Sequence, residues 1–522
     1  VGRDSGTVRV RDVATLVREP QEPPTAILKV NGQRALAIGI STVEGGNVVA
    51  VGNAVGARLR ELESRRPAGL DLHILSYQGE TVDQAVRGFV VSVFQALGIV
   101  VGVLMLFMGL RSGVIIGVTL LLIVAGTFLV MQLMAIDLQR ISLGAWIVAL
   151  GMLVDNAIGV TDGILVRIGK GEDRVKAAGA VVGQTFWPLL GATFVAIMAF
   201  AAIGFSPDST GEYCKSLFQV IAISLLLSWL FAITATPLMC VDFLKAPGNA
   251  GASAAPGRVS GAYRNFLAAV LARRGLVMVA MTVLLALGLF GFGKVKPGFF
   301  PQSARPEFVL DYWLPQGTDI RRTLADTERL ERFVLALDGV EKVSTWVGRG
   351  AVRFMLVYSP EDANSAYAQL LITVRDHRMI DGLMQQIRAE LDAHYLDAQY
   401  KTWKFVLGPG GGSAIEARFA GPETAVLRDL VRQASDLMYA NTNAVNIKND
   451  WRQPVPVLHA VLRPEVAAQV GITRPEVAAA LEVAAEGRRV GVYREGDDVL
   501  GIVARLPADE RNDIEQLHGL FF

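Results

Sequence analysis

Hydrophobic residues gather in six long runs separated by shorter polar stretches. A membrane-spanning helix needs about 20 predominantly apolar residues, and each run is long enough to supply most or all of them. Runs of this length with almost no charge favour membrane spans over the buried core helices of soluble proteins. The six runs cover residues 88–110, 113–134, 141–168, 181–205, 216–241 and 275–293.

One carboxylic acid interrupts the third run near its middle. Asp155 is followed directly by Asn156, and it is the only acid deep inside any of the runs. A charged side chain at this depth in a bilayer is costly, so it indicates a functional site. The other interpretation is a structural acid that stays neutral in every state. We expect Asp155 to take part in the membrane function of the protein.

The chemistry open to such an acid is proton transfer. Low-dielectric surroundings disfavour the charged form of a carboxyl group, and a nearby cation favours it. A group poised between these influences takes up a proton on one side and releases it on the other as its surroundings change. Asp162 follows on the same helix face two turns along. It is interpreted as either a wetted interfacial acid near Arg167 or part of a proton exit.

Glycine recurs on the helix that carries Asp155. Gly151, Gly159 and Gly163 are spaced by eight and four residues. Small residues allow neighbouring membrane helices to approach closely. We therefore expect these glycines to serve helix packing rather than hinge motion.

Basic residues indicate the orientation of the spans. The connections after spans one, three and five carry ten Lys and Arg residues, whereas those after spans two and four carry only Arg140 and Lys215. The positive-inside rule places the basic connections in the cytoplasm. Residues 1–87 and 295–522 then share one extracytoplasmic compartment. Residues 262–274 are predicted to form a basic amphipathic helix lying in the membrane interface before the last span.

Composition agrees with a protein that is part membrane and part soluble. Of the 522 residues, 52% are hydrophobic and 19% are charged. The net charge of +1 gives no signal for nucleic-acid binding. Cys214 and Cys240 lie beside or within apolar runs, which does not indicate a disulfide framework or a metal site. The five histidines lack metal-ligand spacing, so no metal or other cofactor is expected.

The soluble segments alternate strand-like and helix-like patterns. In the first segment, residues 25–30, 35–41 and 70–77 are predicted strands and 46–66 a helix. In the second, strands are predicted at 307–314, 340–347, 351–359, 367–375 and 401–407, with helices at 318–337 and 380–395. A further strand–helix–strand unit is predicted at 414–450. Residues 455–522 are predicted to be strand-rich, with short helices at 464–470 and 475–485.

These patterns predict an α+β membrane protein, in which a bundle of six transmembrane helices carries extracytoplasmic βαβ subdomains of the ferredoxin-like split βαβ type. The glycine-rich residues 408–412 are interpreted as a hinge or crossover loop. The predicted divisions are 1–87, a soluble subdomain; 88–245, five spans; 246–274, a cytoplasmic linker and amphipathic helix; 275–294, the sixth span; 295–412 and 413–454, two further soluble subdomains; and 455–522, an insertion.

Several motifs resemble the resistance-nodulation-division (RND) superfamily of permeases, in its hydrophobe/amphiphile efflux branch. GMLVDNAI at 151–158 is similar to the fourth-span motif of that family, and STGE at 209–212 to the turn before the sixth span. TPLMC at 236–240 is similar to the end of that span. GFFP at 298–301 and DYWLPQGT at 311–318 resemble the start of the second periplasmic loop. The resemblance runs over essentially the whole chain.

The resemblance implies a proton-driven exporter of drugs, detergents and similar amphiphiles at the bacterial inner membrane. It implies a homotrimer that works with a periplasmic adaptor and an outer-membrane channel, with 1–87, 295–412 and 413–454 as porter subdomains and 455–522 as a docking-type insertion. The chain would be an interior piece holding family spans two to seven. Asp155 would be the proton relay, paired with a Lys in the absent half. Asn156 replaces a second Asp of many members, so only a single-carboxylate scheme is retained.

Apolar substrates need pockets lined with apolar and aromatic groups. The candidates are Trp346, Phe354 and Met355, of which Phe354 falls near a pocket phenylalanine of the family. The other interpretation is that the two aromatic residues belong to the ordinary core. Alternative functions are export of metal ions or lipids, and a non-transporting sensor or assembly protein. A tethered hydrolase has no catalytic constellation in its favour.

Overall fold

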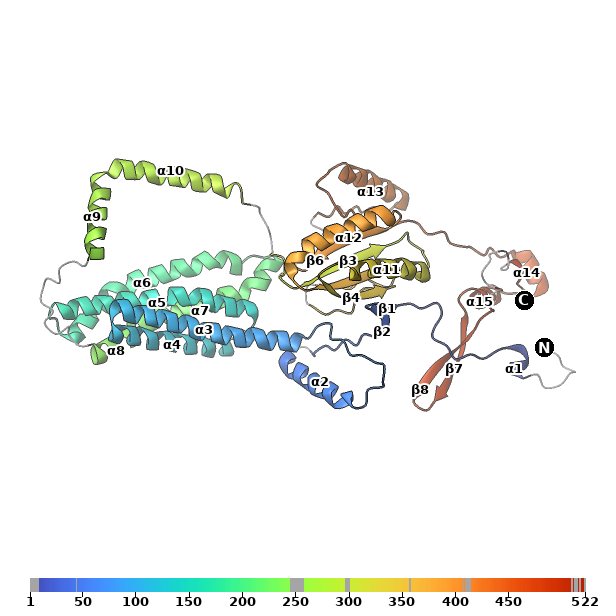
Figure 1. The fold of residues 1–522 in the computed structure, drawn as a ribbon, viewed down its shortest axis with the longest axis horizontal. Coiled ribbons are helices and arrows are strands. Elements are labelled where there is room, and N and C mark those ends of the chain that lie inside the picture. The colour runs from blue at the N-terminus through green and yellow to red at the C-terminus, as the bar shows by residue number, and fades with distance from the viewer. Residues whose placement is uncertain are drawn as a thin grey trace.

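A computed structural model of the chain describes residues 9–43, 45–244, 258–295, 301–355, 358–406, 408, 415–507, 510, 515 and 518–520. Within them, an elongated bundle of apolar helices adjoins a β-sheet with covering helices (Figure 1). The fold is thus mixed helix and sheet. Residues 409–412, most of the predicted hinge loop, and 246–257, most of the predicted linker, lie outside this description, as do 298–300 of the GFFP motif.

The apolar runs form the predicted spans. Six described helical stretches are long and apolar enough to cross a membrane, which confirms the number read from the sequence. Most extend beyond the apolar run by several residues. The helices are α3 (Gln78–Met108), α4 (Leu110–Leu133), α5 (Arg140–Gly169), α6 (Arg174–Gly204), α7 (Ser209–Ile233) continued by α8 (Ala235–Phe243), and α10 (Arg274–Phe292).

Polar residues at the connections set where the helices begin. The Asp173 side chain accepts hydrogen bonds from the backbone N–H groups of Val175 and Lys176 at the start of α6. Asp208 accepts from the N–H of Gly211 at 2.8 Å at the start of α7. Such N-caps satisfy backbone donors that have no partner inside the helix.

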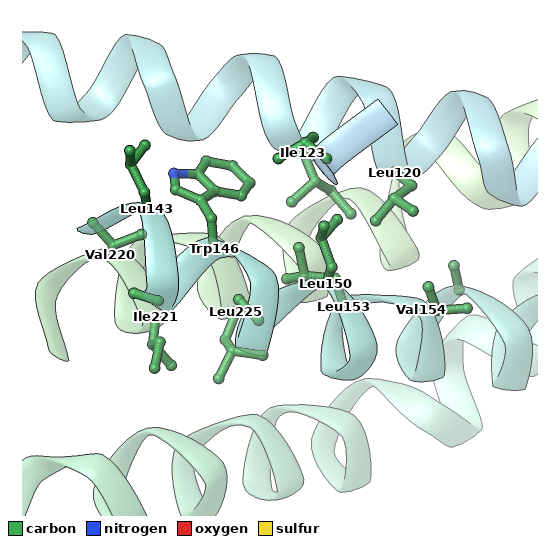
Figure 2. Packing of buried hydrophobic residues seen from close by; sticks show 14 of the residues in the cluster. Leu120, Ile123, Leu143, Trp146, Leu150, Leu153, Val154, Val220, Ile221 and Leu225 are labelled. Carbon is green, nitrogen blue, oxygen red and sulfur yellow. The ribbon is translucent and has the colours of Figure 1, made fainter. Parts of the chain in front are cut away.

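The core of the bundle lies where α4, α5 and α7 meet. Figure 2 shows large apolar side chains from these helices directed toward one another. Trp146 of α5 is fully buried and stacks on Phe128 of α4, with ring centroids 5.0 Å apart. Helix α5 therefore lies centrally, in contact with α3, α4, α6, α7 and α8.

Helices α3 and α4 approach closely along two glycines. Gly109, with φ at +88°, forms the turn between them. A Cβ added to Gly113 would lie 2.8 Å from the backbone nitrogen of Met105, and one added to Gly117 would lie 2.8 Å from Val101 Cγ2. The four-residue spacing puts both glycines on one face of α4, as in the small-xxx-small pattern of membrane helices.

The sixth span is separate from the bundle. Helix α9 (Arg258–Ala272) and α10 contact each other and lie apart from the other spans (Figure 1). No residue of α10 is buried. The helix predicted at 262–274 is thus confirmed as α9, with its start four residues earlier, while its location in the membrane interface stays a prediction.

Six strands form one antiparallel sheet in the order β2-β1-β4-β5-β3-β6. Helices α11 (Ile320–Leu335) and α12 (Ile380–His394) cover one face, where they pack on alternate strand residues such as Phe308, Leu310 and Tyr312. The strands are β1 (Ile27–Val30), β2 (Gln33–Ala35), β3 (Glu307–Trp313), β4 (Val340–Val347), β5 (Tyr367–Val374) and β6 (Gln399–Lys404).

The sheet joins the two soluble segments, which flank the six spans in the sequence. Strand β1 pairs with β4, so that Leu28 lies opposite Trp346. In the turn after β1, the backbone N–H of Gly32 donates to Glu331 Oε1 of α11 at 2.7 Å. These contacts attach the first soluble segment to the larger one.

Four predicted strand regions were wrong. Residues 36–41, 70–77 and 351–355 contain no strand, and the helix α13 (Thr424–Tyr439) has no flanking strands in the described part of 414–450. A strand needs a partner for its backbone groups. In the third region a side chain supplies it, since the N–H of Ala351 donates to Gln369 Oε1. In the first, Leu36 and Ile38 are almost fully exposed.

The remaining elements lie outside the spans and the six-stranded sheet. Helix α2 (Val48–Glu63) falls within the predicted 46–66. Helices α14 (Pro464–Val470) and α15 (Arg474–Ala484) match the short helices predicted there, and the hairpin of β7 (Arg488–Glu495) and β8 (Asp498–Ala504) follows them. The first turn α1 (Val10–Val13) and the 3₁₀ turn η1 (His377–Met379) complete the described elements.

Candidate functional site

Asp155 lies on the open face of α5. Its side chain is exposed, as are Gly151, Gly159 and Asp162 on the same face. A Cβ added to Gly151 or Gly159 would meet no atom within 4 Å. We call these four residues the open strip of α5. The strip combines two carboxyl groups with free space beside them.

The adjacent residue faces the interior of the bundle. Consecutive helix residues are separated by about 100° of rotation, and Asn156 is accordingly buried, with 7% of its surface exposed. Its Nδ2 donates to Thr193 Oγ1 of α6 at 3.4 Å and to Ser228 Oγ of α7 at 3.3 Å. The Ser228 hydroxyl in turn donates to the backbone carbonyl of Leu153 at 2.8 Å. Asn156 therefore connects three helices.

Two further polar contacts cross the bundle toward α8. Thr119 Oγ1 and Thr236 Oγ1 are 3.4 Å apart, and Cys240 Sγ donates to Thr161 Oγ1 at 3.9 Å. All four side chains are fully buried. In an apolar interior such groups are stable only when they find one another, so these pairs fix how the helices fit together.

Arg167, near which Asp162 was expected to lie as an interfacial acid, makes its hydrogen bonds to other residues. The Arg167 guanidinium donates to Glu172 at 3.1 Å and to the side-chain oxygen of Gln184 at 3.1 Å. Asp162 is exposed and belongs to the open strip. The structure thus assigns Arg167 to the α5–α6 connection.

The glycines of α5 divide into two groups. A Cβ on Gly163 would lie 3.0 Å from Val181 Cγ1 of α6, so this glycine serves close helix packing as predicted. Gly151 and Gly159 face open space among the described residues, so the packing expectation stays a prediction for these two glycines. The sequence spacing alone could not distinguish the packed face from the open one.

The three candidate substrate residues lie in one cluster on the sheet face away from α11 and α12. Trp346 is 5% exposed and packs within the cluster, while Phe354 and Met355 are half-buried. Phe354 stacks on Tyr358 with ring centroids 4.9 Å apart and meets the Phe405 ring edge-on at 5.7 Å. Burial of Trp346 agrees with a core role for that residue, whereas Phe354 and Met355 retain exposed surface.

A buried acid in this cluster was missed at the sequence level. Asp311 of β3 is 6% exposed. Its Oδ1 accepts from Tyr367 Oη at 2.7 Å and Gln369 Nε2 at 2.8 Å, and its Oδ2 accepts from Trp403 Nε1 at 2.7 Å. Burial raises the pKa of the Asp311 carboxyl, although the three donors oppose this. The signal in the sequence was an acid, Asp311, among the apolar and aromatic residues of the strand.

Metal-ligating side chains do not gather in the described part of the chain. No group of three or more His, Cys, Asp or Glu residues there is placed to hold a metal ion. Both cysteines are free thiols.

Six apolar spans joined to a soluble sheet define a multi-pass membrane protein. A family model for the AcrB/AcrD/AcrF family matches residues 1–522, and the chain belongs to this family of RND permeases. The resemblance read from the sequence motifs is therefore confirmed. Proteins of this family are transporters and not enzymes.

Proposed function

We propose that the protein is a proton-driven exporter of hydrophobic or amphiphilic compounds, with Asp155 as the proton relay. The observation that carries the proposal is the position of Asp155 on the open strip, directly beside the anchored Asn156. An acid maintained at this depth of a membrane span marks ion pathways and proton relays. Membership of a transporter family supports the same role.

The anchoring of Asn156 supports a single-carboxylate mechanism. An amide cannot take up or release a proton in the physiological range, but it donates and accepts hydrogen bonds. Its contacts with Thr193 and Ser228 hold the middle of α5 against α6 and α7. Asp155 is thereby directed away from those helices, toward the side where further helices would approach.

The open strip has room for a cationic partner. The glycines beside Asp155 leave free space at the helix surface. A Lys from a further span, facing Asp155, would stabilise its charged form, and loss of that contact would favour its protonated form. Asp162, nearer the basic end of α5, is proposed as part of the route by which the proton leaves.

The soluble part is proposed to be a periplasmic porter region. The element order β3-α11-β4-β5-α12-β6 and the strand order β4-β5-β3-β6 support the proposal of a ferredoxin-like split βαβ unit. The excess of basic residues on one side of the spans supports its extracytoplasmic location at the inner membrane. The proposed lining of the substrate path consists of Phe354, Met355 and Trp346. Trp346 is the buried member of the three.

The proposed assembly is a homotrimer that cooperates with a periplasmic adaptor and an outer-membrane channel. This extends to the chain what holds for members of its family. Substrates would enter from the membrane or periplasm and leave through the channel, while protons move inward past Asp155.

The test is export by the whole protein in a bacterium that lacks its own pumps. We expect Asp155→Asn to abolish resistance at an unchanged membrane level, because an amide cannot carry the proton. The matched control is Asp83→Asn, the same change at a partly buried acid that pairs with Arg87 near the start of α3. Unchanged export by Asp155→Asn would falsify the relay role. Absence of resistance with the unaltered protein would instead contradict the proposed substrate class.

A further inference from the structure

We propose that Asp311 is a positioning residue that, through Gln369, holds Ala351 and Tyr358, on either side of Phe354 and Met355, and thereby sets substrate selection. Residues 351–355 together with Tyr358 are called the segment below. This rests on the proposed function, in which Phe354 and Met355 of this segment touch the substrate. The segment is the region predicted as a strand that has no strand partner in the described part of the chain. Its attachment to the sheet runs through side chains.

Asp311 fixes the orientation of the Gln369 side-chain amide. Strands β3 and β5 place Asp311 and Gln369 directly opposite each other. The Asp311 carboxylate accepts from Gln369 Nε2, and its remaining hydrogen bonds come from Tyr367 and Trp403. In its ionised form the Asp311 carboxylate only accepts hydrogen bonds. The amide nitrogen of Gln369 must therefore face Asp311, and its oxygen must face the other way.

The side-chain oxygen of Gln369 binds Ala351 and Tyr358. Gln369 Oε1 accepts from the backbone N–H of Ala351 at 3.0 Å and from the Tyr358 hydroxyl at 2.7 Å. The same hydroxyl is 3.3 Å from the carbonyl oxygen of Ala351. One side-chain oxygen thus holds both ends of the segment. An amide turned the other way would present a donor to the Ala351 N–H and leave it unsatisfied.

Tyr358 in turn contacts the candidate substrate residues Phe354 and Met355. Tyr358, fixed through its hydroxyl, stacks on the ring of Phe354 at 4.9 Å, and the backbone N–H of Tyr358 donates to the carbonyl of Met355 at 3.3 Å. Directly before the segment in the chain, the Gly350 N–H donates to the carbonyl of Glu361 at 3.1 Å. The connection from Asp311 through Gln369 and Tyr358 to Phe354 is therefore continuous.

The alternative is that Asp311 only stabilises the sheet. It lies between β5 and β6, and its contacts with Tyr367 and Trp403 join these strands to β3. A purely structural role predicts equal loss of export for all substrates when Asp311 or Gln369 is changed. A positioning role predicts a change in the ratio between substrates.

Hydrogen exchange of the Ala351 amide in the whole protein tests the positioning directly and does not depend on transport. In Gln369→Met we expect exchange about five- to tenfold faster, as for the loss of one hydrogen bond. Trp403→Phe is the matched control, because it removes a donor from the other oxygen of Asp311 and leaves Gln369 in place. Exchange at Ala351 is expected to be unchanged in this control.

A double-mutant comparison assigns the effect to the connection. Asp311→Leu should also speed exchange at Ala351, and it should add nothing once Gln369 is Met, since both changes break one path. Additive effects would overturn the proposal. If Asp311→Leu does not reach the membrane, the result for Gln369→Met alone tests the proposal. Unchanged exchange of the Ala351 amide in Gln369→Met overturns the proposal.

Export measured with substrates of different size completes the test. We expect Gln369→Met to change the ratio of resistance between a small and a large substrate several-fold at an unchanged protein level. Faster exchange with an unaltered ratio would overturn the role in selection. Failure of the unaltered protein to export contradicts the proposed function, and the exchange measurement still decides whether Asp311 positions the segment.

Discussion

Asn156 Nδ2 and Ser228 Oγ lie 3.3 Å apart and join α5 to α7 beside the residue proposed to carry the proton. Ser228 uses its own proton to reach the backbone carbonyl of Leu153. The serine thus makes two contacts to α5 from another helix. Both are buried in apolar surroundings, where polar groups lack water as an alternative partner.

Ser228→Ala should lower the stability of the bundle by about 1–2 kcal/mol, because it leaves the Asn156 amide and the Leu153 carbonyl without this partner. Thermal unfolding of the whole protein in detergent measures the effect. Ser92→Ala is the matched control, since Ser92 is partly buried and its hydroxyl donates within its own helix, to the carbonyl of Gly88. Equal losses in the two variants would contradict the cross-helix role of Ser228.

Gly113→Ala should destabilise the α3–α4 pair by about 1–3 kcal/mol, as for overpacked sites. The added methyl group would lie 2.8 Å from the backbone nitrogen of Met105, which cannot move aside as a flexible side chain can. Gly98→Ala on α3 is the control, because a Cβ there meets no atom within 4 Å. The melting temperatures of the two variants, measured side by side, check this prediction. A control that loses as much stability would contradict the packing argument.

Asp311 should make the stability of the soluble part depend on pH. Burial raises its pKa in the folded protein, so over a range above its ordinary value of about 3.9 the folded state holds a proton that the unfolded chain has lost. Unfolding free energy then falls as pH rises. The stabilisation is fully present below about pH 4 and is lost as pH rises through the raised pKa.

The measurement is the melting temperature of the soluble part, followed by tryptophan fluorescence across that pH range in the whole protein. In Asp311→Asn, the part of the fall in melting temperature with rising pH that comes from Asp311 should be absent. Glu331, whose pKa is also raised by burial, keeps its own decline in the same direction in this variant. An identical pH profile for both proteins would rule out Asp311 as a source.

Glu331→Ala should loosen the β1–β2 hairpin from α11. Glu331 is 1% exposed and accepts the N–H of Gly32 at 2.7 Å, so its removal leaves a backbone donor without its partner at a cost of about 1–3 kcal/mol. Faster hydrogen exchange at Gly32 measures this. Glu331→Gln retains an acceptor oxygen and should keep most of the protection. Equal exchange in both variants would mean that the contact does not hold the hairpin.

The spans were predictable because a long apolar run has few alternatives to a membrane helix. Strands such as β3 and β5 were predictable because buried apolar residues recur along them. The segment 351–359 misled the prediction because its pattern suits a strand, while Gln369 supplies the hydrogen bond that a neighbouring strand would give. Pairing partners cannot be read from local pattern alone.

The candidate site shows the same limit. Asp155 was found because its cost in an apolar run is visible in the sequence. The contacts of Asn156 and Asp311 were not, because their partners lie far along the chain. Tyr367, Gln369 and Trp403 are 56, 58 and 92 residues away from Asp311. Only the strand pairing brings these groups together.

The sheet is open along the outer side of β2, where no described strand pairs with it. The chain continues there with Leu36 and Ile38, which expose 97% and 88% of their surface. A free edge beside exposed apolar residues is a template on which another strand can be added. The soluble part, once separated from its surroundings, should therefore self-associate at this edge. A lysine or proline in place of Ile38 is the change that would keep its copies apart.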